Sequence, residues 1–415
     1  MEIGREEGME YKGLDPLSGN ILAVRVREGR IDSVEAMDAP ASTRMGESSL
    51  PYLCRGFLDM QVNGYMGSDY SLEDFSRDHL EKIVAHMARS GTSCHIPTIV
   101  TRPRDLLLRN LEIIREARKS SPVLAAAIPG VHIEGPYISS EDGPRGAHDP
   151  AFVRDPRFEE FLEWQEASGG LVHMVTIAPE REGALEFTRK LTALGVVVAL
   201  GHTAATPEQI RQAVAAGAKV STHLGNGSHA SIPRLRNYIW EQLATDELAA
   251  SLIADGFHLP ETVMKVFTRA KGLDRLVLVS DAALLGGYSP GIYSWGNLKV
   301  EVFPDGHIGL PGTTFLAGAA HLLDWDIPVF MRATGATLGE TIRLCTENPA
   351  RLLGLDSEAS GFQKPGAPKS PGLGLAPGSA ANLVFFRHSP GMQRLEIGTC
   401  VVGGQAMGRS LSRSP

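Results

Sequence analysis

The sequence predicts an α/β protein whose centre is a (β/α)8 TIM-type barrel, with a small β-sandwich domain built from both chain ends. Three observations predict this architecture. Eight short apolar runs follow one another between residues 55 and 282, helix-like segments separate most of them, and both chain ends show the alternation typical of strands. Alternating strands and helices imply parallel strands joined by crossover helices, and eight such units can close a barrel. An open doubly wound sheet is the alternative architecture.

The two chain ends are predicted to pair with each other. Residues 19–38 alternate apolar and polar side chains around a Glu-Gly turn, which is typical of a β-hairpin. Residues 379–388 and 393–407 are strand-like as well. Residues 357–375 are rich in Gly, Pro, Ser and Lys, so we expect a flexible connection before these last strands.

Residues 56–360 are expected to form the barrel, and residues 1–55 with 361–415 the small β domain. Residues 71–91 and 182–195 have the composition of helices that would lie between strands. The eight predicted strands are residues 55–63, 92–100, 128–135, 171–179, 196–203, 218–224, 250–258 and 275–282.

Composition narrows the class of protein. A formal net charge of -8 argues against a general binder of nucleic acids or of anionic membranes. The four cysteines are scattered and form no C-x-x-C pair, a pattern typical of reduced thiols in a cytosolic protein. The N-terminus has no signal-peptide pattern, and no apolar run approaches the ~20 residues needed to span a bilayer. We therefore expect a cytoplasmic protein.

Polar residues gather where the predicted strands end. In a barrel of this type the catalytic groups lie at the carboxyl ends of the strands, so residues that end separate strands can converge. Two histidines and one glutamate with an open position for water would form a catalytic zinc shell, and iron, manganese or cobalt can take similar ligands. A single His at a strand end is more often structural than a metal ligand. Four carboxylate or imidazole side chains at the same end of four different strands favour a metal site. The strand-end residues are Asp59, Gln61, Asn63, Glu134, His202, His223, Asp255, His258 and Asp281.

An ordered set of motifs carries a resemblance to a known family. The motifs are "RGFLDMQVNGYMGSDYS", "HIEGPYI…GAHDP", "VALGHTAAT", "STHLGNG", "LIADGFHLP", "LVSDAALLGG" and "TTFLAGAAHLLD". In this order, from about Gly56 to Leu355, they resemble the N-acetylglucosamine-6-phosphate deacetylase family of the amidohydrolase superfamily. The family's small β domain, built from both chain ends, fits the rest of the sequence.

The resemblance implies roles for particular residues. Glu134, His202 and His223 would be ligands of one divalent cation, most simply zinc, and Asp281 would be the catalytic acid/base. Arg234 falls where the family commonly places a phosphate-contacting arginine, which would serve the neighbouring subunit of a homodimer. The implied substrate-binding residues are Ala147, His148, Asn226, Gly227, Arg234, His258, Leu316, Ala317 and Gly318.

The chain departs from the family pattern in two places. Many amidohydrolases carry His-x-His after the first strand to hold a second metal, whereas this chain has Gln61 and Asn63. Amides are poor ligands for such a cation, so one metal per chain is expected. The family usually continues from Asn with Ala-Met and later Arg-x-Pro-Gly, whereas here Ser228 takes the Met place and no Pro-Gly follows Arg234. Arg236 is therefore a second candidate for the phosphate contact.

The function implied by the resemblance is metal-dependent deacetylation of N-acetylglucosamine 6-phosphate to glucosamine 6-phosphate and acetate, in amino-sugar catabolism and cell-wall recycling. The partner would be this small phosphorylated amino sugar. One alternative is a related amidohydrolase that acts on a different N-acetylated sugar or a cyclic amide. A second alternative, a non-catalytic scaffold, is disfavoured because the expected ligands and Asp281 are all present.

Overall fold

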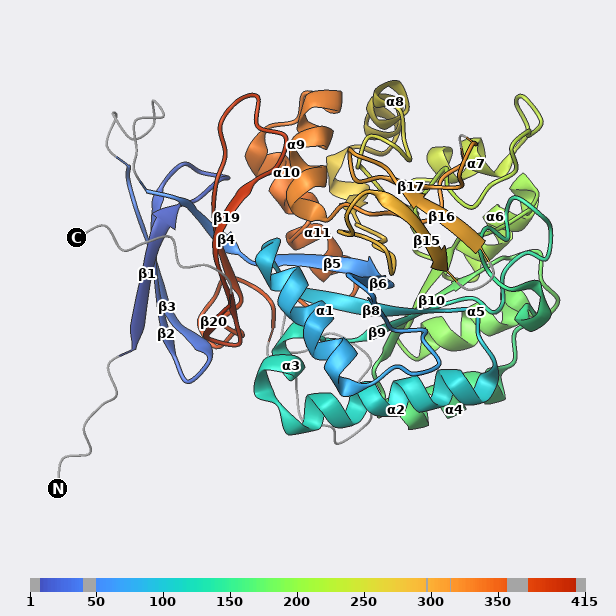
Figure 1. Ribbon diagram of the computed structural model, residues 1–415, viewed down its shortest axis with the longest axis horizontal. Helices are drawn as coiled ribbons and strands as arrows, with labels where there is room; N and C mark the ends of the chain where they lie inside the picture. The colour runs from blue at the N-terminus through green and yellow to red at the C-terminus, as the bar shows by residue number, and fades with distance from the viewer. Residues whose placement is uncertain (1–7, 40–49, 296–297, 314, 357–371, 408–415) are drawn as a thin grey trace.

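The central feature of the computed structural model is an eight-stranded parallel sheet with the strand order β5-β8-β9-β10-β11-β12-β13-β14 (Figure 1). The structure describes residues 8–39, 50–295, 298–313, 315–356 and 372–407. Each of the eight predicted strands is present, so the predicted barrel is confirmed. The strands are β5 (Phe57–Val62), β8 (Thr92–Val100), β9 (Val131–Glu134), β10 (Val172–Ile177), β11 (Val197–Leu200), β12 (Val220–Ser221), β13 (Ala249–Leu252) and β14 (Leu276–Leu278).

The first strand and the segment after the last strand, β14, close the barrel at its mouth. Asp281 N donates to Gln61 O at 3.0 Å, and Asn63 N donates to Ala282 O at 3.0 Å. A parallel bridge joins Val62 and Ala282. This closure brings the polar residues that follow β5 next to Asp281.

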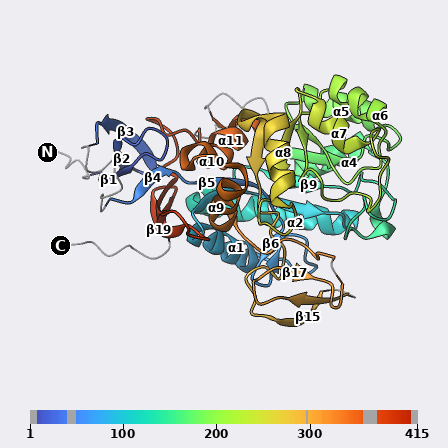
Figure 2. The same cartoon turned by 90° about the horizontal axis from the view of Figure 1, so that it is seen from above.

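Helices cover the outside of the barrel (Figures 1 and 2). The reason is that the strands carry apolar side chains on their outer face as well as on their inner face. Ile133, Val175 and Val198 point outward into one apolar cluster with the helices, whereas their neighbours Met174 and Ala199 belong to a cluster inside the barrel. This alternation is the period of two expected for strands that are buried on both faces. The helices are α1 (Arg77–Arg89), α2 (Arg104–Ser120), α3 (Pro122–Ala127), α4 (Phe158–Ser168), α5 (Ala184–Ala193), α6 (Pro207–Ala215), α7 (Tyr238–Ala244), α8 (Glu261–Lys271), α9 (Leu323–Thr334), α10 (Leu338–Leu344), α11 (Glu347–Leu352) and the 3-10 turns η2 (Pro150–Phe152) and η3 (Leu273–Arg275).

Both chain ends join in one seven-stranded sheet beside the barrel (Figure 1). The predicted hairpin is confirmed, because β2 and β3 pair antiparallel around Glu28 and Gly29. Residues 357–371, most of the predicted connection, lie outside the described residues, and the exact domain limits stay a prediction. In spatial order the strands are β20 (Gln405–Met407), β19 (Glu396–Val402), β18 (Leu383–Arg387), β4 (Tyr52–Arg55), β1 (Met9–Leu14), β2 (Ile21–Arg27) and β3 (Arg30–Met37).

A three-stranded antiparallel sheet is inserted after β14 and projects from the barrel (Figure 2). It consists of β15 (Gly291–Trp295), β16 (Leu298–Val302) and β17 (Ile308–Gly309), and no strand is predicted there from the sequence. A small hairpin of β6 (Gly64–Tyr65) and β7 (Ser68–Asp69) follows β5 at the mouth.

All four cysteines are buried free thiols. Within the described ranges, no helix is both long and apolar enough to cross a membrane.

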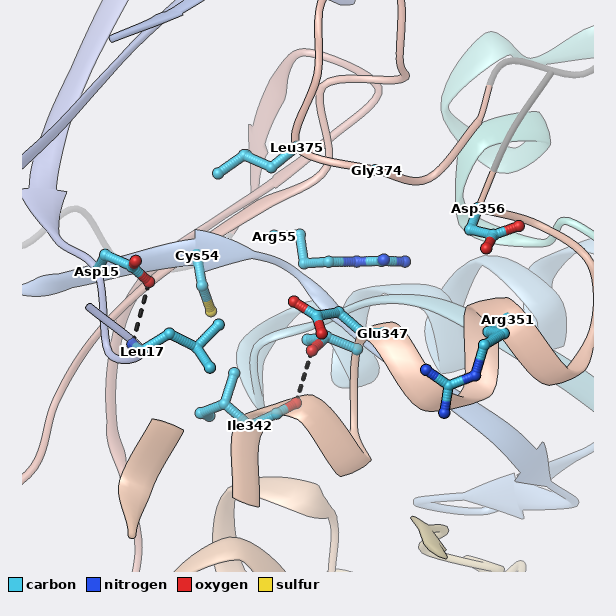
Figure 3. A pocket seen from close by; sticks show the side chains of 11 residues that line it. Asp15, Leu17, Cys54, Arg55, Ile342, Glu347, Arg351, Asp356, Gly374 and Leu375 are labelled. Atoms are coloured by element: carbon cyan, nitrogen blue, oxygen red, sulfur yellow. Dashed lines mark hydrogen bonds between the residues drawn. The ribbon is translucent and has the colours of Figure 1, made fainter. Parts of the chain in front are cut away.

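A cavity of about 450 Å³ lies between the chain-end sheet and helices α10 and α11 (Figure 3). Arg55, which lines it, lies two residues before the amino-terminal end of β5. The cavity is therefore at the end of the barrel opposite to the strand ends that carry the predicted site.

Candidate active site

Three of the predicted site residues have an unusual backbone where their strands end. His202 lies two residues after β11, His223 two residues after β12, and Asp281 three residues after β14. Their φ angles are 51°, 30° and 49°, in the left-handed region that residues with a Cβ rarely adopt. Such conformations persist only where the surrounding structure enforces them, and they concentrate at functional sites. The left-handed turn aims each side chain across the barrel mouth.

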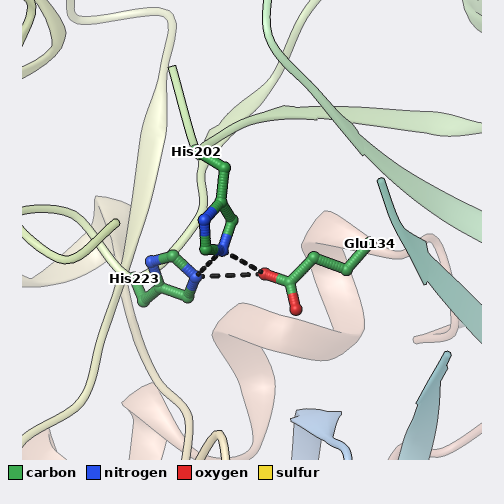
Figure 4. Close-up of side chains that lie close together, drawn as sticks. All are labelled: Glu134, His202 and His223. Atoms are coloured by element: carbon green, nitrogen blue, oxygen red, sulfur yellow. Dashed lines mark hydrogen bonds and ion pairs between the residues drawn. The ribbon is translucent and has the colours of Figure 1, made fainter. Parts of the chain in front are cut away.

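Glu134, His202 and His223 converge on one point (Figure 4). His223 Nε2 lies 3.0 Å from Glu134 Oε1 and 3.1 Å from His202 Nε2, and His202 Nε2 lies 3.2 Å from Glu134 Oε1. A tetrahedral zinc with ligand bonds of about 2.0–2.1 Å would place its ligands ~3.3–3.4 Å apart. The three buried atoms therefore fit one face of the coordination shell of a divalent metal.

A hydrogen bond to the far nitrogen orients the imidazole ring of His202. His202 Nδ1 donates to Pro144 O at 2.9 Å, which leaves the lone pair of Nε2 facing the cluster. His223 is held through its backbone instead, because its N–H donates to Ser251 Oγ at 2.7 Å. No hydrogen-bond partner of the buried His223 Nδ1 lies within the described part of the chain.

Electrostatics favour a negative charge on Glu134. Burial by itself would raise the pKa of Glu134, but hydrogen bonds from His202 and His223 hold that pKa well below its ordinary value. In His223 burial alone would lower the pKa, yet the contact with Glu134 raises it above its ordinary value. Glu134 is therefore an anionic oxygen held at the barrel mouth, which suits a cation.

The amides of Gln61 and Asn63 hold the two carboxylates. Gln61 Nε2 donates to Glu134 Oε1 at 2.9 Å, and Asn63 Nδ2 donates to Asp281 Oδ1 at 2.7 Å. Burial, followed by the charge of Glu134, raises the pKa of Asp281 to about 6. A carboxylate with such a pKa can exchange protons near neutral pH, as a general acid/base must.

His148 lies beside the cluster as a neutral imidazole. Its ring packs edge-on against that of His202, with centroids 4.4 Å apart. Burial lowers the pKa of His148 well below its ordinary value. His148 Nδ1 lies 2.8 Å from Thr101 Oγ1 and accepts from Thr101 N at 3.4 Å, an arrangement that places the ring proton on Nε2.

A polar layer lies directly beneath Glu134, His202 and His223 inside the barrel. His132, two residues before Glu134 on the same strand, contacts Thr98 Oγ1 at 3.2 Å and Thr176 Oγ1 at 2.7 Å. Thr176 Oγ1 in turn lies 2.8 Å from Thr222 Oγ1. The layer satisfies these buried polar groups and ties β8, β9 and β10 together below the site.

The remaining predicted substrate residues surround this centre unevenly. His258 Nδ1 is held by Asp255 Oδ2 at 2.8 Å. Asn226 folds back so that its Nδ2 donates to His223 O at 3.3 Å, and Gly227 packs on the His202 ring. Leu316, Ala317 and Gly318 run beside β17, where Ala317 N donates to Ile308 O at 3.0 Å.

Ala147, Arg234 and Arg236 are exposed. Arg234 contributes its carbonyl oxygen to Trp240 Nε1 at 3.1 Å. Within the described residues, no hydrogen bond or ion pair joins either arginine side chain to the cluster.

Several residues that shape the site carry no signal strong enough to be found from sequence. The Pro144 carbonyl is a main-chain group, and only the fold reveals its contact with His202. Thr101 follows a strand that contributes no ligand. Glu141 lies in the gap of the motif "HIEGPYI…GAHDP" and His229 lies two residues after "STHLGNG", and their contact joins two loops 88 residues apart in sequence.

The fold and the site together define a class of protein. A closed parallel barrel whose strand ends combine a buried Glu/His/His metal-binding group with a neighbouring aspartate is the architecture of a metal-dependent amidohydrolase.

Comparisons with known proteins narrow this class. The chain is 32% identical to N-acetylgalactosamine-6-phosphate deacetylase of Escherichia coli O157:H7 over 346 residues, which cover 83% of this chain and 88% of that protein. It is 35% identical to N-acetylglucosamine-6-phosphate deacetylase of Bos taurus over 319 residues, covering 73% and 75% of the two chains. The structure of the same enzyme from Thermotoga maritima superimposes with a TM-score of 0.79 at 26% identity, covering 97% of this chain and 100% of that one. No family model matches the chain.

The chain belongs to the N-acetylglucosamine-6-phosphate deacetylase family.

Proposed function

We propose that this protein hydrolyses the acetamide bond of N-acetylglucosamine 6-phosphate and releases glucosamine 6-phosphate and acetate. The convergence of Glu134, His202 and His223 at the mouth of the barrel, beside Asp281, carries this proposal. Membership of the family supports the choice of substrate.

Each residue of the centre has a role in the proposed reaction. Glu134, His202 and His223 would hold one divalent cation, and Gln61 would keep the Glu134 carboxylate in place. The cation would supply Lewis-acid chemistry, lowering the pKa of water towards ~7 and polarising a carbonyl. Asp281 would accept the proton of the attacking water and deliver it to the departing amine nitrogen.

His148 would act as a donor to the carbonyl oxygen of the substrate. Its neutral ring carries the proton on Nε2, so it can donate a hydrogen bond without changing its charge. A preorganised donor of this kind is worth about 3 kcal/mol when negative charge develops on the oxygen. Thr101 fixes the tautomer and so would keep this donor available.

Zinc is the cation that we propose. Two imidazole nitrogens and one carboxylate oxygen are ligands that zinc accepts in catalytic sites, and iron, manganese and cobalt accept them too. Gln61 and Asn63 offer amides where other amidohydrolases offer imidazoles, which supports one cation per chain. Elemental analysis of protein purified without added metal tests both points.

The C4 epimer is a second candidate substrate. The relative from Escherichia coli acts, by its name, on N-acetylgalactosamine 6-phosphate, and it covers more of this chain than the bovine relative does. Both sugars present the same acetamide to Asp281 and the same 6-phosphate to Arg234 or Arg236. Choice between them would depend on the residues expected to contact the sugar ring, among them His258 and Leu316.

A panel of substrates tests the proposal. Acetate release would be measured with both N-acetylhexosamine 6-phosphates and with unphosphorylated N-acetylglucosamine, and ring opening would be measured with a cyclic amide such as dihydrouracil. The proposal expects the highest kcat/KM for N-acetylglucosamine 6-phosphate. Turnover of the cyclic amide alone would overturn it, and faster turnover of the epimer would reassign the substrate while leaving the chemistry intact.

We also propose a cytoplasmic homodimer. The four buried free thiols support a reducing compartment, and the exposed Arg234 is available to a second subunit. Sedimentation velocity of the full chain gives the oligomeric state directly.

A further inference from the structure

Two loops of the barrel mouth meet above the ring of His202. The first, residues 135–149, follows β9, and the second, residues 222–237, leads into α7. From the first loop, Pro144 O accepts the hydrogen bond of His202 Nδ1 at 2.9 Å, and Ser139 N donates to His202 O at 2.8 Å. The first loop therefore fixes both the ring and the backbone of His202.

The second loop packs against the same ring through a glycine. Gly227 has a φ of +54°, and a Cβ at this position would lie 2.7 Å from His202 Nδ1. Real Cβ atoms do not approach other atoms so closely, so only glycine allows this contact. The ring of His202 is thus enclosed by Pro144 on one loop and Gly227 on the other.

His229 joins the two loops directly. Its Nε2 lies 3.1 Å from Glu141 Oε2 on the first loop, and its Nδ1 lies 3.1 Å from Tyr238 OH at the start of α7. The backbone N–H of His229 donates to the same hydroxyl at 2.9 Å. The two loops also touch at Gly143 of the first loop. A Cβ added at this glycine would lie only 3.1 Å from the Cα of His229.

One arrangement of protons satisfies these contacts of His229 together. A tyrosine hydroxyl has one donor and can accept as well, so Tyr238 accepts from the His229 backbone and donates to Nδ1. The ring proton then resides on Nε2, where Glu141 accepts it. Tyr238 is 5% exposed, so this end of the bridge is anchored in the core.

We propose that His229 is a positioning residue for the metal ligand His202. By joining Glu141 to the anchored Tyr238, it holds the loop of residues 135–149 in the position where Pro144 O meets His202 Nδ1. The inference rests on the role of His202 in the proposed function. Because a hydrogen bond on the far nitrogen orients a ligating imidazole and increases its basicity, loosening this loop should weaken retention of the cation.

If the contact between His229 and Glu141 only stabilised the fold, its loss would lower the melting temperature. The proposal predicts a different outcome. The side chains of His229 and Glu141 are 28% and 64% exposed, and exposed pairs contribute little to folding stability. Replacing either should leave the melting temperature nearly unchanged while the cation is lost faster. Metal retention therefore separates positioning from general stabilisation.

The first measurement is the rate at which zinc-loaded protein loses zinc to an excess of chelator. We expect His229→Ala to lose zinc about tenfold faster than wild type, and Glu141→Ala to change in the same direction. Glu141→Gln keeps an acceptor for His229 Nε2 and should restore much of the retention. Glu163→Ala is the matched control, because Glu163 forms an exposed pair of 2.7 Å with Arg104 on the outer helices.

The second measurement is amide hydrogen exchange of residues 139–146 in the metal-free protein, which we expect to be faster in His229→Ala and unchanged in Glu163→Ala. Unchanged zinc loss and unchanged exchange in folded His229→Ala and Glu141→Ala would overturn the inference. If wild type holds no stoichiometric cation, the proposed metal site fails, and the exchange rates still decide whether His229 holds the loop.

Discussion

The side-chain amide of Asn63 donates a hydrogen bond of 2.7 Å to Asp281 Oδ1. The two residues are 218 positions apart and meet because β5 and the segment after β14 close the barrel. This bond stabilises the ionised form of Asp281, whereas burial and the charge of Glu134 raise its pKa. The amide is therefore placed to adjust the proton affinity of the proposed acid/base.

Replacing Asn63 by Ala should move the acidic limb of the kcat/KM profile upward by about one pH unit. The shift corresponds to the loss of one hydrogen bond to a charged group. Asp281 must be ionised to accept a proton, so a higher pKa lowers activity at pH 6 more than at pH 8. A profile from pH 5 to 8.5, recorded with metal content verified, checks this. An unshifted or downward-shifted limb would show that Asn63 does not control this group.

The protein should bind one divalent cation per chain. Glu134→Ala and His202→Ala should each reduce the bound metal to a small fraction, because each removes one of three ligands. His86→Ala on the outer helix α1 is the control and should keep the full complement. Elemental analysis after gel filtration gives the stoichiometry. Two equivalents in wild type would contradict a site limited by Gln61 and Asn63.

Arg234→Ala should raise KM for the phosphorylated sugar about tenfold or more and leave unphosphorylated N-acetylglucosamine unaffected. A guanidinium grips a phosphate through two parallel hydrogen bonds, and a charged hydrogen bond is worth about 1.5–3 kcal/mol. Arg236→Ala is the matched comparison, because both arginines are exposed on the same loop. A KM increase only in Arg236→Ala would move the role to that residue. If wild type does not prefer the phosphorylated sugar, the phosphate specificity is wrong.

Asp326→Asn should make the protein more stable at neutral pH. Asp326 is fully buried in α9, and burial raises its pKa well above the ordinary value. A folded-state pKa that is raised means that the folded protein holds a proton which the unfolded chain releases above pH ~4. Stability then falls as pH rises, by about 1.4 kcal/mol per pH unit for this one group. Chemical denaturation between pH 5 and 7 should show that Asp326→Asn removes this slope, and an unchanged slope would mean that Asp326 is ionised in the fold.

The convergence of Glu134, His202 and His223 could be predicted because the barrel imposes a rule on residues that end its strands. Glu134, His202 and His223 each stand where an apolar run ends, and parallel strands bring all such ends to one mouth. The ring orientations could not be predicted, since that of His202 depends on the Pro144 carbonyl, which has no side-chain signature.

Two further features of the structure were not predicted from the sequence. Strand β16, "LKVEV", alternates apolar and polar residues, but its sheet with β15 and β17 is an insertion outside the β/α rhythm from which the barrel was predicted. The contact of His229 with Glu141 requires the relative placement of two loops. Arg234 was predicted from the resemblance, and its role in substrate binding stays a prediction.

The most direct test of the account is acetate release from N-acetylglucosamine 6-phosphate by Asp281→Asn with its bound metal measured in the same preparation. Asparagine keeps the shape of Asp281 and removes its ability to accept a proton, and the three ligands stay intact. We predict one equivalent of metal and a loss of about 10³-fold or more in kcat. Near-normal turnover by the metal-loaded variant would contradict the role of Asp281 and the mechanism built on it.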